Sequence, residues 1–387
     1  MAHRQGNKIS EIVELVPDVI ELIVNKLPSY CLSSCRLVCK TWNNVILSSK
    51  YHPSISAASN FFLAHVYSES RDRPNSHRFR NLHCLELDPD HVEGVRSVAS
   101  FNLKRKYFKR SFISIINSCN GLLAFVVTKK TNSWLSPNSV VILNPITNEY
   151  FELPKDKYKG NWFTCCYGFG FCPKTKQYKV VRSSTIRDRN SIIHNYKTEI
   201  FAFGTRPEWT QIESPTCSFN GCHGVYLNGG LHWIGQNNLG PDVIYRLNME
   251  DEKYEQIPFP NDDGYFPCIG IFNGAIHLTL SMEGYKYRVW KMKEDGSWIK
   301  AFSVIVPDVN KNILSFSKST VEPIKICKDG KILCLWAGAE LVLYNPTTKK
   351  MEKLIDDTTA RDISVHNIDC FTFNALPHIL TGKLGKF

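Results

Sequence analysis

The chain has 387 residues and a formal net charge of +11, with 43% hydrophobic and 21% charged residues. This composition indicates a globular protein that is long enough for one large domain and one small one. No apolar run reaches the roughly 18 residues that a membrane-spanning helix needs, so the sequence gives no reason to expect a membrane partner.

Residues 1–14 predict a flexible N-terminus. Their sequence, MAHRQGNKISEIVE, has neither an apolar segment nor a small-residue cleavage site, so no secretory signal is expected. The 14 cysteines are scattered and none forms a CxxC pair, which favours reduced thiols in the cytoplasm or nucleus. Cys31, Cys35 and Cys39 recur at steps of four, but no histidine lies near them in the sequence. We therefore expect no metal and no cofactor.

Residues 15–55 predict a small helical domain of two short amphipathic helices. Asp18 is a candidate N-cap of the first helix. Pro28 ends that helix because it lacks an amide proton, and Ser29 is a candidate N-cap of the second. About thirty residues cannot bury this much apolar surface alone. Periodicity leaves two interpretations open: a cap packed on the rest of the chain, or a docking face for another protein.

This stretch resembles an F-box, the motif that docks on the Skp-type adaptor of cullin–RING ubiquitin ligases. The matching residues are Leu15, Asp18, Ile23, Leu27-Pro28, Leu32, Cys35-Arg36, Val38-Cys39-Lys40 and Trp42. The first proline of the family pattern aligns with Val16, and proline stands one place later, at Pro17. The resemblance implies that the adaptor is bound by Leu15, Pro17, Ile20, Ile23, Leu27, Pro28, Leu32, Val38 and Trp42.

From about Asn60 the helical period disappears and short β-rich runs follow, separated by turn residues. Four segments repeat a hairpin dipeptide followed by an apolar strand: Asn120-Gly121, Asn228-Gly229, Asn273-Gly274 and Asp329-Gly330. Both central residues of such a turn need positive φ. A unit of roughly 45–55 residues with three or four strands is typical of a propeller blade.

The predicted fold class is α+β multidomain: a small helical domain, then an all-β propeller-like domain of about six blades over residues 60–380. Five blades are clear in the sequence. A sixth would combine strands at 61–68 and 83–88 with a C-terminal strand at 368–373. Pairing the first and last strands in one blade would hide two sheet edges.

The β-rich part also resembles the F-box-associated domain of the large plant F-box family, which includes kelch-like members. Eight phrases carry this resemblance in the family's order: SCNGLLAF, ILNPITNEYFELP, YGFGFCPKTKQYKVV, TEIFAFGTRPEWTQI, GVYLNGGLHWIG, YRLNMEDEKYEQIPFP, YRVWKMKEDGSWIKAF and LVLYNPTTKK. They cover most of residues 100–350.

Several residues could suggest catalysis, but packing explains them better. His232 and His277 occupy the same position of two repeats, which favours a structural role. Cys222 and His223 are adjacent, and neighbouring residues of a strand point to opposite faces. The glycines of YGFGF at 167–171 are followed by no helix or phosphate-loop lysine, so they indicate strand glycines beside aromatic rings. Trp209, Trp233, Trp290 and Trp298 are expected in the blade cores or in the packing between blades.

Recognition is expected on three polar, basic inserts, because propellers present variable loops on one rim. The inserts are 68–80, 128–138 and 182–195, and their candidate target-binding residues lie near Arg71, Trp134 and Arg187. The basic cluster Lys104-Arg105-Lys106 favours a solvated loop, so nucleic acid is not expected as a partner.

The sequence therefore predicts a non-catalytic substrate-recognition subunit of a Skp–cullin–F-box ubiquitin ligase. It would dock on the adaptor by its helices and bind an unidentified target protein by its propeller-like domain, in the cytoplasm or nucleus. Two alternatives stay open: a propeller-type binding or scaffold protein without ubiquitin transfer, and a propeller enzyme.

Overall fold

The computed structural model describes most of the chain. The described residues are 16–24, 35, 38–47, 60–69, 77–87, 96–101, 111–120, 122–129, 139–144, 149–154, 162–187, 193–204, 208–219, 223–236, 242–306, 320–336, 340–353 and 365–369. The predicted N-terminal segment 1–14 and the basic cluster at 104–106 lie outside them.

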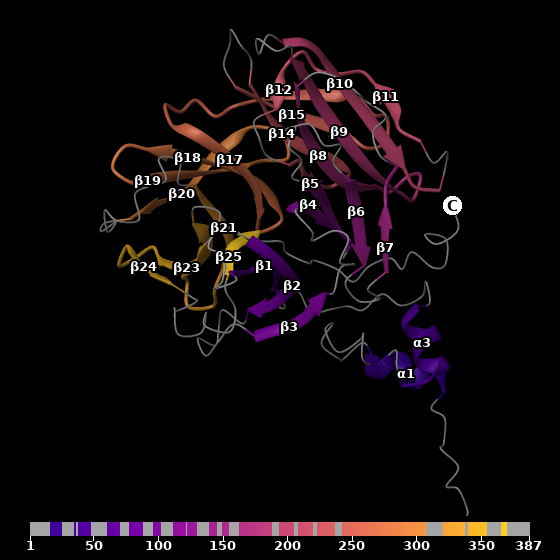
Figure 1. Cartoon of the computed structure of the whole chain (residues 1–387). Helices are drawn as coiled ribbons and strands as arrows, with labels where there is room; N and C mark the ends of the chain where they lie inside the picture. Colours follow the sequence, from indigo (N-terminus) through magenta and orange to yellow (C-terminus); the bar gives the residue numbers. More distant parts are fainter. Residues whose placement is uncertain are drawn as a thin grey trace, which may run out of the picture.

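Two short helices, α1 (Pro17–Val24) and α3 (Lys40–Leu47), contact each other and lie to one side of the sheets (Figure 1). Pro17 is the first helical residue, where its missing amide proton costs nothing. The Val16 carbonyl accepts the amides of Val19 and Ile20, at 3.0 and 3.2 Å. Asp18 was predicted as the N-cap, but that position belongs to Val16, and Asp18 lies in the first turn.

The rest of the described chain forms six antiparallel sheets, numbered I to VI in chain order. Sheet I has the order β25-β1-β2-β3, built from β1 (Asn60–Glu69), β2 (His77–Leu87), β3 (Arg96–Phe101) and β25 (Val365–Asp369). Sheet II contains β4 (Ser111–Cys119), β5 (Leu122–Lys129), β6 (Ser139–Asn144) and β7 (Glu149–Glu152). Sheet III contains β8 (Trp162–Cys172), β9 (Gln177–Arg187), β10 (Ile193–Ala202) and β11 (Thr210–Ile212).

The other three sheets repeat this arrangement. Sheet IV contains β12 (Ser218–Phe219), β13 (Val225–Leu227), β14 (Gly230–Gln236), β15 (Val243–Asn248) and β16 (Tyr254–Pro258); β12 and β13 both pair with β14. Sheet V contains β17 (Tyr265–Phe272), β18 (Ala275–Met282), β19 (Lys286–Met292) and β20 (Trp298–Ile305). Sheet VI contains β21 (Val321–Ile326), β22 (Ile332–Trp336), β23 (Glu340–Asn345) and β24 (Lys350–Lys353).

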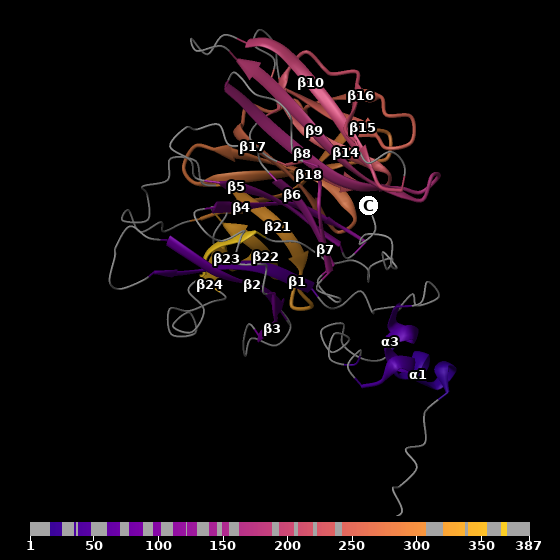
Figure 2. The same ribbon diagram turned by 45° about the vertical axis from the view of Figure 1, so that its right-hand side comes forward.

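The sheets are arranged about a common centre as the blades of a propeller (Figures 1 and 2). The innermost strands are β13 in sheet IV and the first strands of sheets II, III, V and VI, because β4 contacts β8, β8 contacts β13, β13 contacts β17 and β17 contacts β21. Each of these five sheets comes from one continuous stretch of chain. Sheet I instead joins the two ends of the domain, since β25 pairs with β1 through Leu63 and Asp369. The predicted pairing of the first and last strands is confirmed.

The hairpin dipeptides mostly behave as predicted. Asn228-Gly229 and Asn273-Gly274 have positive φ at both residues, of 46°, 73°, 48° and 71°. Asp329-Gly330 differs, because only Gly330 has positive φ, at 82°. This loop closes instead with the Cys327 amide donating to the Lys331 carbonyl, which leaves more room in the turn.

All connections from a second to a third strand leave the ring on one face, called here the loop face. The chain crosses each sheet from its innermost to its outermost strand, and a short connection such as 259–264 then leads to the next innermost strand. Every innermost strand therefore starts on the same face. The strands β1, β5 and β9, near whose ends the three predicted inserts begin, all end on this face.

Glycines let aromatic rings approach between sheets III and IV. A Cβ on Gly168 would lie 2.6 Å from the Trp233 ring, and one on Gly170 would lie 2.5 Å from the Tyr226 ring. The prediction for the YGFGF glycines is confirmed. Trp233 itself is 1% exposed, as predicted for a core residue.

Two further tryptophans link neighbouring sheets at their outer edge. The Trp209 indole donates to the Pro154 carbonyl at 3.0 Å, and the Trp298 indole donates to the Pro258 carbonyl at 2.8 Å. The same joint thus connects sheet III to sheet II and sheet V to sheet IV. Trp290 packs on the core between sheets IV and V.

Candidate protein-docking surfaces

The helix pair has an apolar interior and an apolar exterior. Ile20 and Val24 are completely buried. Nine large hydrophobic side chains are exposed among the described residues, and four of them belong to this small domain. These four are Val16, Val19, Leu22 and Val38, with exposures of 60%, 38%, 64% and 64%. Such a concentration of exposed apolar side chains is typical of a surface that another protein covers.

The predicted adaptor-binding residues fall into three groups. Pro17 and Val38 are exposed, and Ile23 and Trp42 are half-buried. Ile20 packs inside the helix pair rather than on its surface. The remaining predicted residues, Leu15, Leu27, Pro28 and Leu32, lie outside the described residues. Val19 and Leu22 were missed because the helical period alone does not show which apolar stripe faces outward.

The predicted target-binding inserts are only partly visible. Arg71 and Trp134 lie outside the described residues. The third insert, 182–195, was predicted as a loop, but most of it is strand: Arg187 ends β9, and β10 begins at Ile193. The strands of sheet III are longer than the alternation of the sequence suggested, because they continue through the polar run RSST at 182–185.

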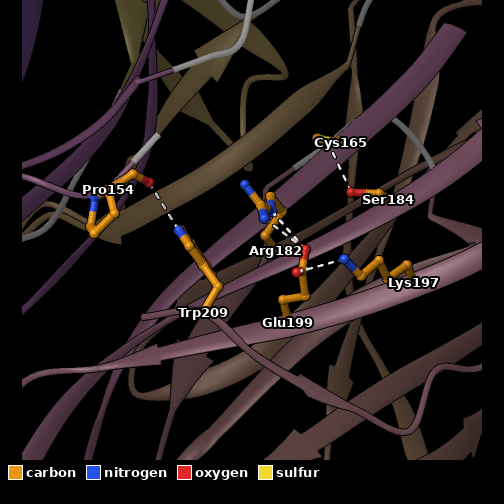
Figure 3. A network of polar contacts seen from close by, with 7 residues as sticks. All are labelled: Pro154, Cys165, Arg182, Ser184, Lys197, Glu199 and Trp209. Carbon is orange, nitrogen blue, oxygen red and sulfur yellow. Dashed lines mark hydrogen bonds and ion pairs between the residues drawn. The ribbon is translucent and has the colours of Figure 1, made fainter. Parts of the chain in front are cut away.

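A network of buried polar side chains occupies the face of sheet III that packs towards sheet II (Figure 3). Arg182 and Glu199 lie directly opposite on β9 and β10, with 2.6 Å between Nη2 and Oε2. Lys197 also reaches Glu199, at 2.7 Å. The Arg182 guanidinium stacks 4.3 Å from the Trp209 ring centre, and Trp209 in turn donates to Pro154 of sheet II. The network thus joins two blades.

The network does not present a reactive group to solvent. Arg182 and Glu199 are 4% and 8% exposed. Burial would raise the pKa of Glu199, but hydrogen bonds from Lys197 and Arg182 outweigh it and hold the pKa below its usual range. The Cys165 thiol lies 3.1 Å from the Ser184 hydroxyl, which extends the network along the sheet. These contacts indicate a structural joint.

The three histidines considered for catalysis are neutral; His232 and His277 are buried, and His223 is half-buried. Burial lowers the pKa of His223, His232 and His277 to about 4 in each case. His232 and His277 are each 2% exposed, and the His232 Nδ1 lies 3.2 Å from the Val225 carbonyl. Neither can exchange protons with a substrate, so the repeat position has a structural role.

The structure does bring a serine to His223 that the sequence did not indicate. Ser114 Oγ on β4 lies 2.9 Å from His223 Nε2, although 109 residues separate them in the chain. The Nδ1 atom of His223 is buried and has no hydrogen-bond partner. A nucleophilic serine needs a histidine that a third group orients, and here no carboxylate does so.

Within the described residues, no group of three or more His, Cys, Asp or Glu side chains could hold a metal ion. In the same part of the chain, no helix is long and apolar enough to cross a membrane.

Comparison with known proteins agrees with this arrangement. Residues 80–355 match the family model of the F-box associated beta propeller domain, and residues 12–54 match that of the F-box domain. F-box protein At3g07870 of Arabidopsis thaliana is 24% identical, over 88% of this chain and 87% of that protein. F-box/kelch-repeat protein At3g23880 of Arabidopsis thaliana is 21% identical, over 90% of this chain and 93% of that protein. The chain therefore belongs to the family of plant F-box proteins that carry an F-box associated beta propeller domain.

Proposed function

We propose that the chain is the substrate receptor of a Skp–cullin–F-box ubiquitin ligase. In this proposal the helix pair docks on the Skp-type adaptor, and the propeller holds a target protein. The observation that carries it is the group of exposed apolar side chains on the helix pair, at Val16, Val19, Leu22 and Val38. A second protein that covered them would remove this apolar surface from water.

The chain itself performs no chemistry in this proposal. The assembled ligase raises the effective concentration of target lysines near a ubiquitin-charged conjugating enzyme. The enclosed, neutral histidines and the structural polar network support this division of labour. The free cysteines of the described residues are consistent with the cytoplasm or nucleus, where we also propose that the protein acts.

The adaptor surface can be tested without disturbing the core of the helix pair. Val19 and Leu22 are three residues apart and exposed, so Val19→Arg with Leu22→Arg places two charges on one stripe of α1. Asn44→Arg is the matched control, because Asn44 is an exposed polar residue of α3. The full chain is co-purified with a Skp-type adaptor in all three forms.

Wild type and Asn44→Arg should retain the adaptor in a stoichiometric complex, and the double variant should lose it. Full retention by the double variant would show that this surface is not the docking site. Absence of binding by folded wild type would instead favour a scaffold without ubiquitin transfer. The scaffold function has a specific observation in its favour, because the exposed Val16 stands where the family pattern has a proline.

A further inference from the structure

Sheet V exposes three aromatic side chains at its loop-face end. Tyr265 and Phe266 open β17, and Tyr285 lies in the turn between β18 and β19, with exposures of 44%, 41% and 38%. They belong to the same end of the sheet because Tyr265 pairs with Ser281, shortly before that turn. The rings of Tyr265 and Phe266 meet edge to face, 5.2 Å apart. We call these three residues the aromatic patch.

The backbone holds two of the three rings outward at a conformational cost. Phe266 and Tyr285 have φ of +49° and +53°, in the left-handed region that bulky residues rarely adopt. Pro267 follows Phe266 and cannot donate to the ladder, and the register shifts between Tyr265 and Cys268. Neither strained ring is buried, so core packing does not offset this cost. Strain retained at an exposed position is typical of a binding surface.

The segment beneath the patch is fixed on the sheet. The Asp262 side chain is fully buried and accepts hydrogen bonds from the Gly264 amide, Arg288 and Trp290, at 3.0, 2.6 and 2.8 Å. A Cβ on Gly264 would lie 2.6 Å from Leu280, so the segment runs directly against β18. Because it is anchored this way, the patch is presented in one arrangement and would lose little freedom on binding.

The chain segment that carries the patch is acidic, in contrast to the chain as a whole. No lysine or arginine occurs between Lys253 and Lys286, although the chain carries a net charge of +11. Four acidic residues lie in that interval: Glu255, Asp262, Asp263 and Glu283. Arg288 neutralises the buried Asp262, whereas the Asp263 side chain is 84% exposed and Glu283 is exposed as well. Arg288 also reaches Asp263, at 3.2 Å, but most of that carboxylate stays open to solvent. Exposed aromatic rings beside exposed carboxylates favour a cationic side chain.

We propose that the aromatic patch binds a basic segment of a target protein that alternates Lys or Arg with apolar side chains. The cations would lie against the rings of the patch and beside Asp263 and Glu283, and the apolar side chains would cover the remaining ring surface. That the bound segment belongs to a ligase target rests on the proposed function, whereas the chemistry of binding rests on the aromatic patch itself.

The test uses the full chain and two fluorescein-labelled twelve-residue peptides, one alternating Lys with Leu and one alternating Glu with Leu. Long-range attraction to a chain of net charge +11 would favour the Glu peptide. Tighter binding of the Lys peptide therefore reports a local site. Fluorescence anisotropy measures both affinities for wild type and for the variants below.

Phe266→Asn with Tyr265→Ser should weaken binding of the Lys peptide by at least about tenfold, which corresponds to a loss of about 1.4 kcal/mol. Asparagine tolerates positive φ, so this variant removes the ring without adding strain. The matched control is Ile299→Ser with Ile326→Ser, which removes side chains of 42% and 44% exposure at the opposite end of sheets V and VI. It should bind as wild type does.

The proposal for the aromatic patch would be overturned if wild type preferred the Glu peptide. It would also be overturned if both double variants bound the Lys peptide equally. Adaptor co-purification of the same samples separates this proposal from the ligase role. Adaptor binding without Lys-peptide binding contradicts only the patch. Selective Lys-peptide binding without adaptor binding contradicts only the ligase role.

Discussion

Sheet III pairs two buried charged side chains with each other where it faces sheet II, whereas sheet V buries a neutral histidine where it faces sheet VI. On sheet III, Arg182 and Glu199 form an ion pair with 2.6 Å between Nη2 and Oε2. On sheet V, neither ring nitrogen of His277 has a hydrogen-bond partner. The carboxyl of Glu322 on the facing sheet VI receives only the Cys268 thiol, at 3.0 Å.

The difference shows two ways of making a buried polar group tolerable. The carboxyl of Glu199 stays ionised because Lys197 and Arg182 offset the effect of burial on its pKa. Burial instead lowers the pKa of His277 to about 4 and raises the pKa of Glu322, so it favours the neutral form of both groups. Sheet III is thus sensitive to the loss of a partner, and the contact between sheets V and VI is sensitive to protonation.

Removing the partner on sheet III should have the largest effect. Glu199→Ala leaves the Arg182 guanidinium buried beside Trp209 with no carboxylate opposite it. We expect the free energy of unfolding to fall by about 3–5 kcal/mol, since a buried charge is then uncompensated. Urea denaturation followed by far-UV circular dichroism measures this change.

Sheet IV supplies the control for that substitution. Arg246 and Glu255 are also directly opposite on neighbouring strands, with 2.8 Å between Nη1 and Oε2, but the Glu255 side chain is 57% exposed. Glu255→Ala should cost less than about 1 kcal/mol, because solvent screens an exposed pair. Equal losses for Glu199→Ala and Glu255→Ala would mean that burial does not decide what these pairs contribute.

Acidification should act on the contact between sheets V and VI. The folded-state pKa of His277 is about 4, below the unfolded value of about 6.5, so the unfolded chain binds the extra proton between these pH values. The contribution of His277 is therefore complete above pH about 6.5 and is lost as the pH falls towards 4. We expect each such histidine to lower stability by about 1.4 kcal/mol per pH unit within this range.

His277→Leu isolates this effect, because leucine removes the titrating ring and the ring nitrogens have no side-chain hydrogen-bond partner to lose among the described residues. The free energy of unfolding of the variant, measured by urea denaturation, should rise relative to that of wild type as the pH falls from 6.5 to 4.5. Glu322→Gln should act in the opposite direction. A raised pKa means that the contribution of Glu322 is complete below the unfolded pKa and is lost as the pH rises through the higher folded-state pKa. Parallel pH profiles for wild type and His277→Leu would contradict the prediction.

The sequence predicted this fold well where local chemistry specifies it. Asn-Gly dipeptides require positive φ, so Asn228 and Asn273 marked their turns correctly. The closing pair of β1 and β25 followed from the need to cover sheet edges. The continuation of β9 to Arg187 did not follow, because polar residues such as Arg182 are stabilised by partners on other strands.

The candidate docking surfaces were harder to predict, for the same reason. Which apolar residues of α1 face outward depends on how α3 packs, so Ile20 and Leu22 could not be distinguished by period. Phe266 gave no signal at all, since its exposure follows from a bulge and from the anchoring of Asp262 by Arg288. Local sequence patterns do not report such long-range contacts.

The smallest expected effect is on the tryptophan hydrogen bond that joins neighbouring sheets, which occurs in both sheet III and sheet V. Trp298→Phe in sheet V removes the hydrogen bond to the Pro258 carbonyl and keeps most of the aromatic packing. We expect the free energy of unfolding to fall by about 1 kcal/mol, the usual net value of one hydrogen bond. Trp209→Phe in sheet III removes the equivalent bond to Pro154 and also weakens the stacking with Arg182. Its cost should exceed that of Trp298→Phe by about 0.5–1 kcal/mol.

The same joint is therefore stronger where a buried charge depends on it. Combining Trp209→Phe with Glu199→Ala tests this coupling, because both side chains contact Arg182. The two losses should not add, since residues that share a partner couple by about 0.5–3 kcal/mol. Trp298→Phe lies in another sheet without such a partner, and its loss should add to that of Glu199→Ala within about 0.5 kcal/mol. Additive losses for both tryptophans would show that Arg182 does not link the joint to the ion pair.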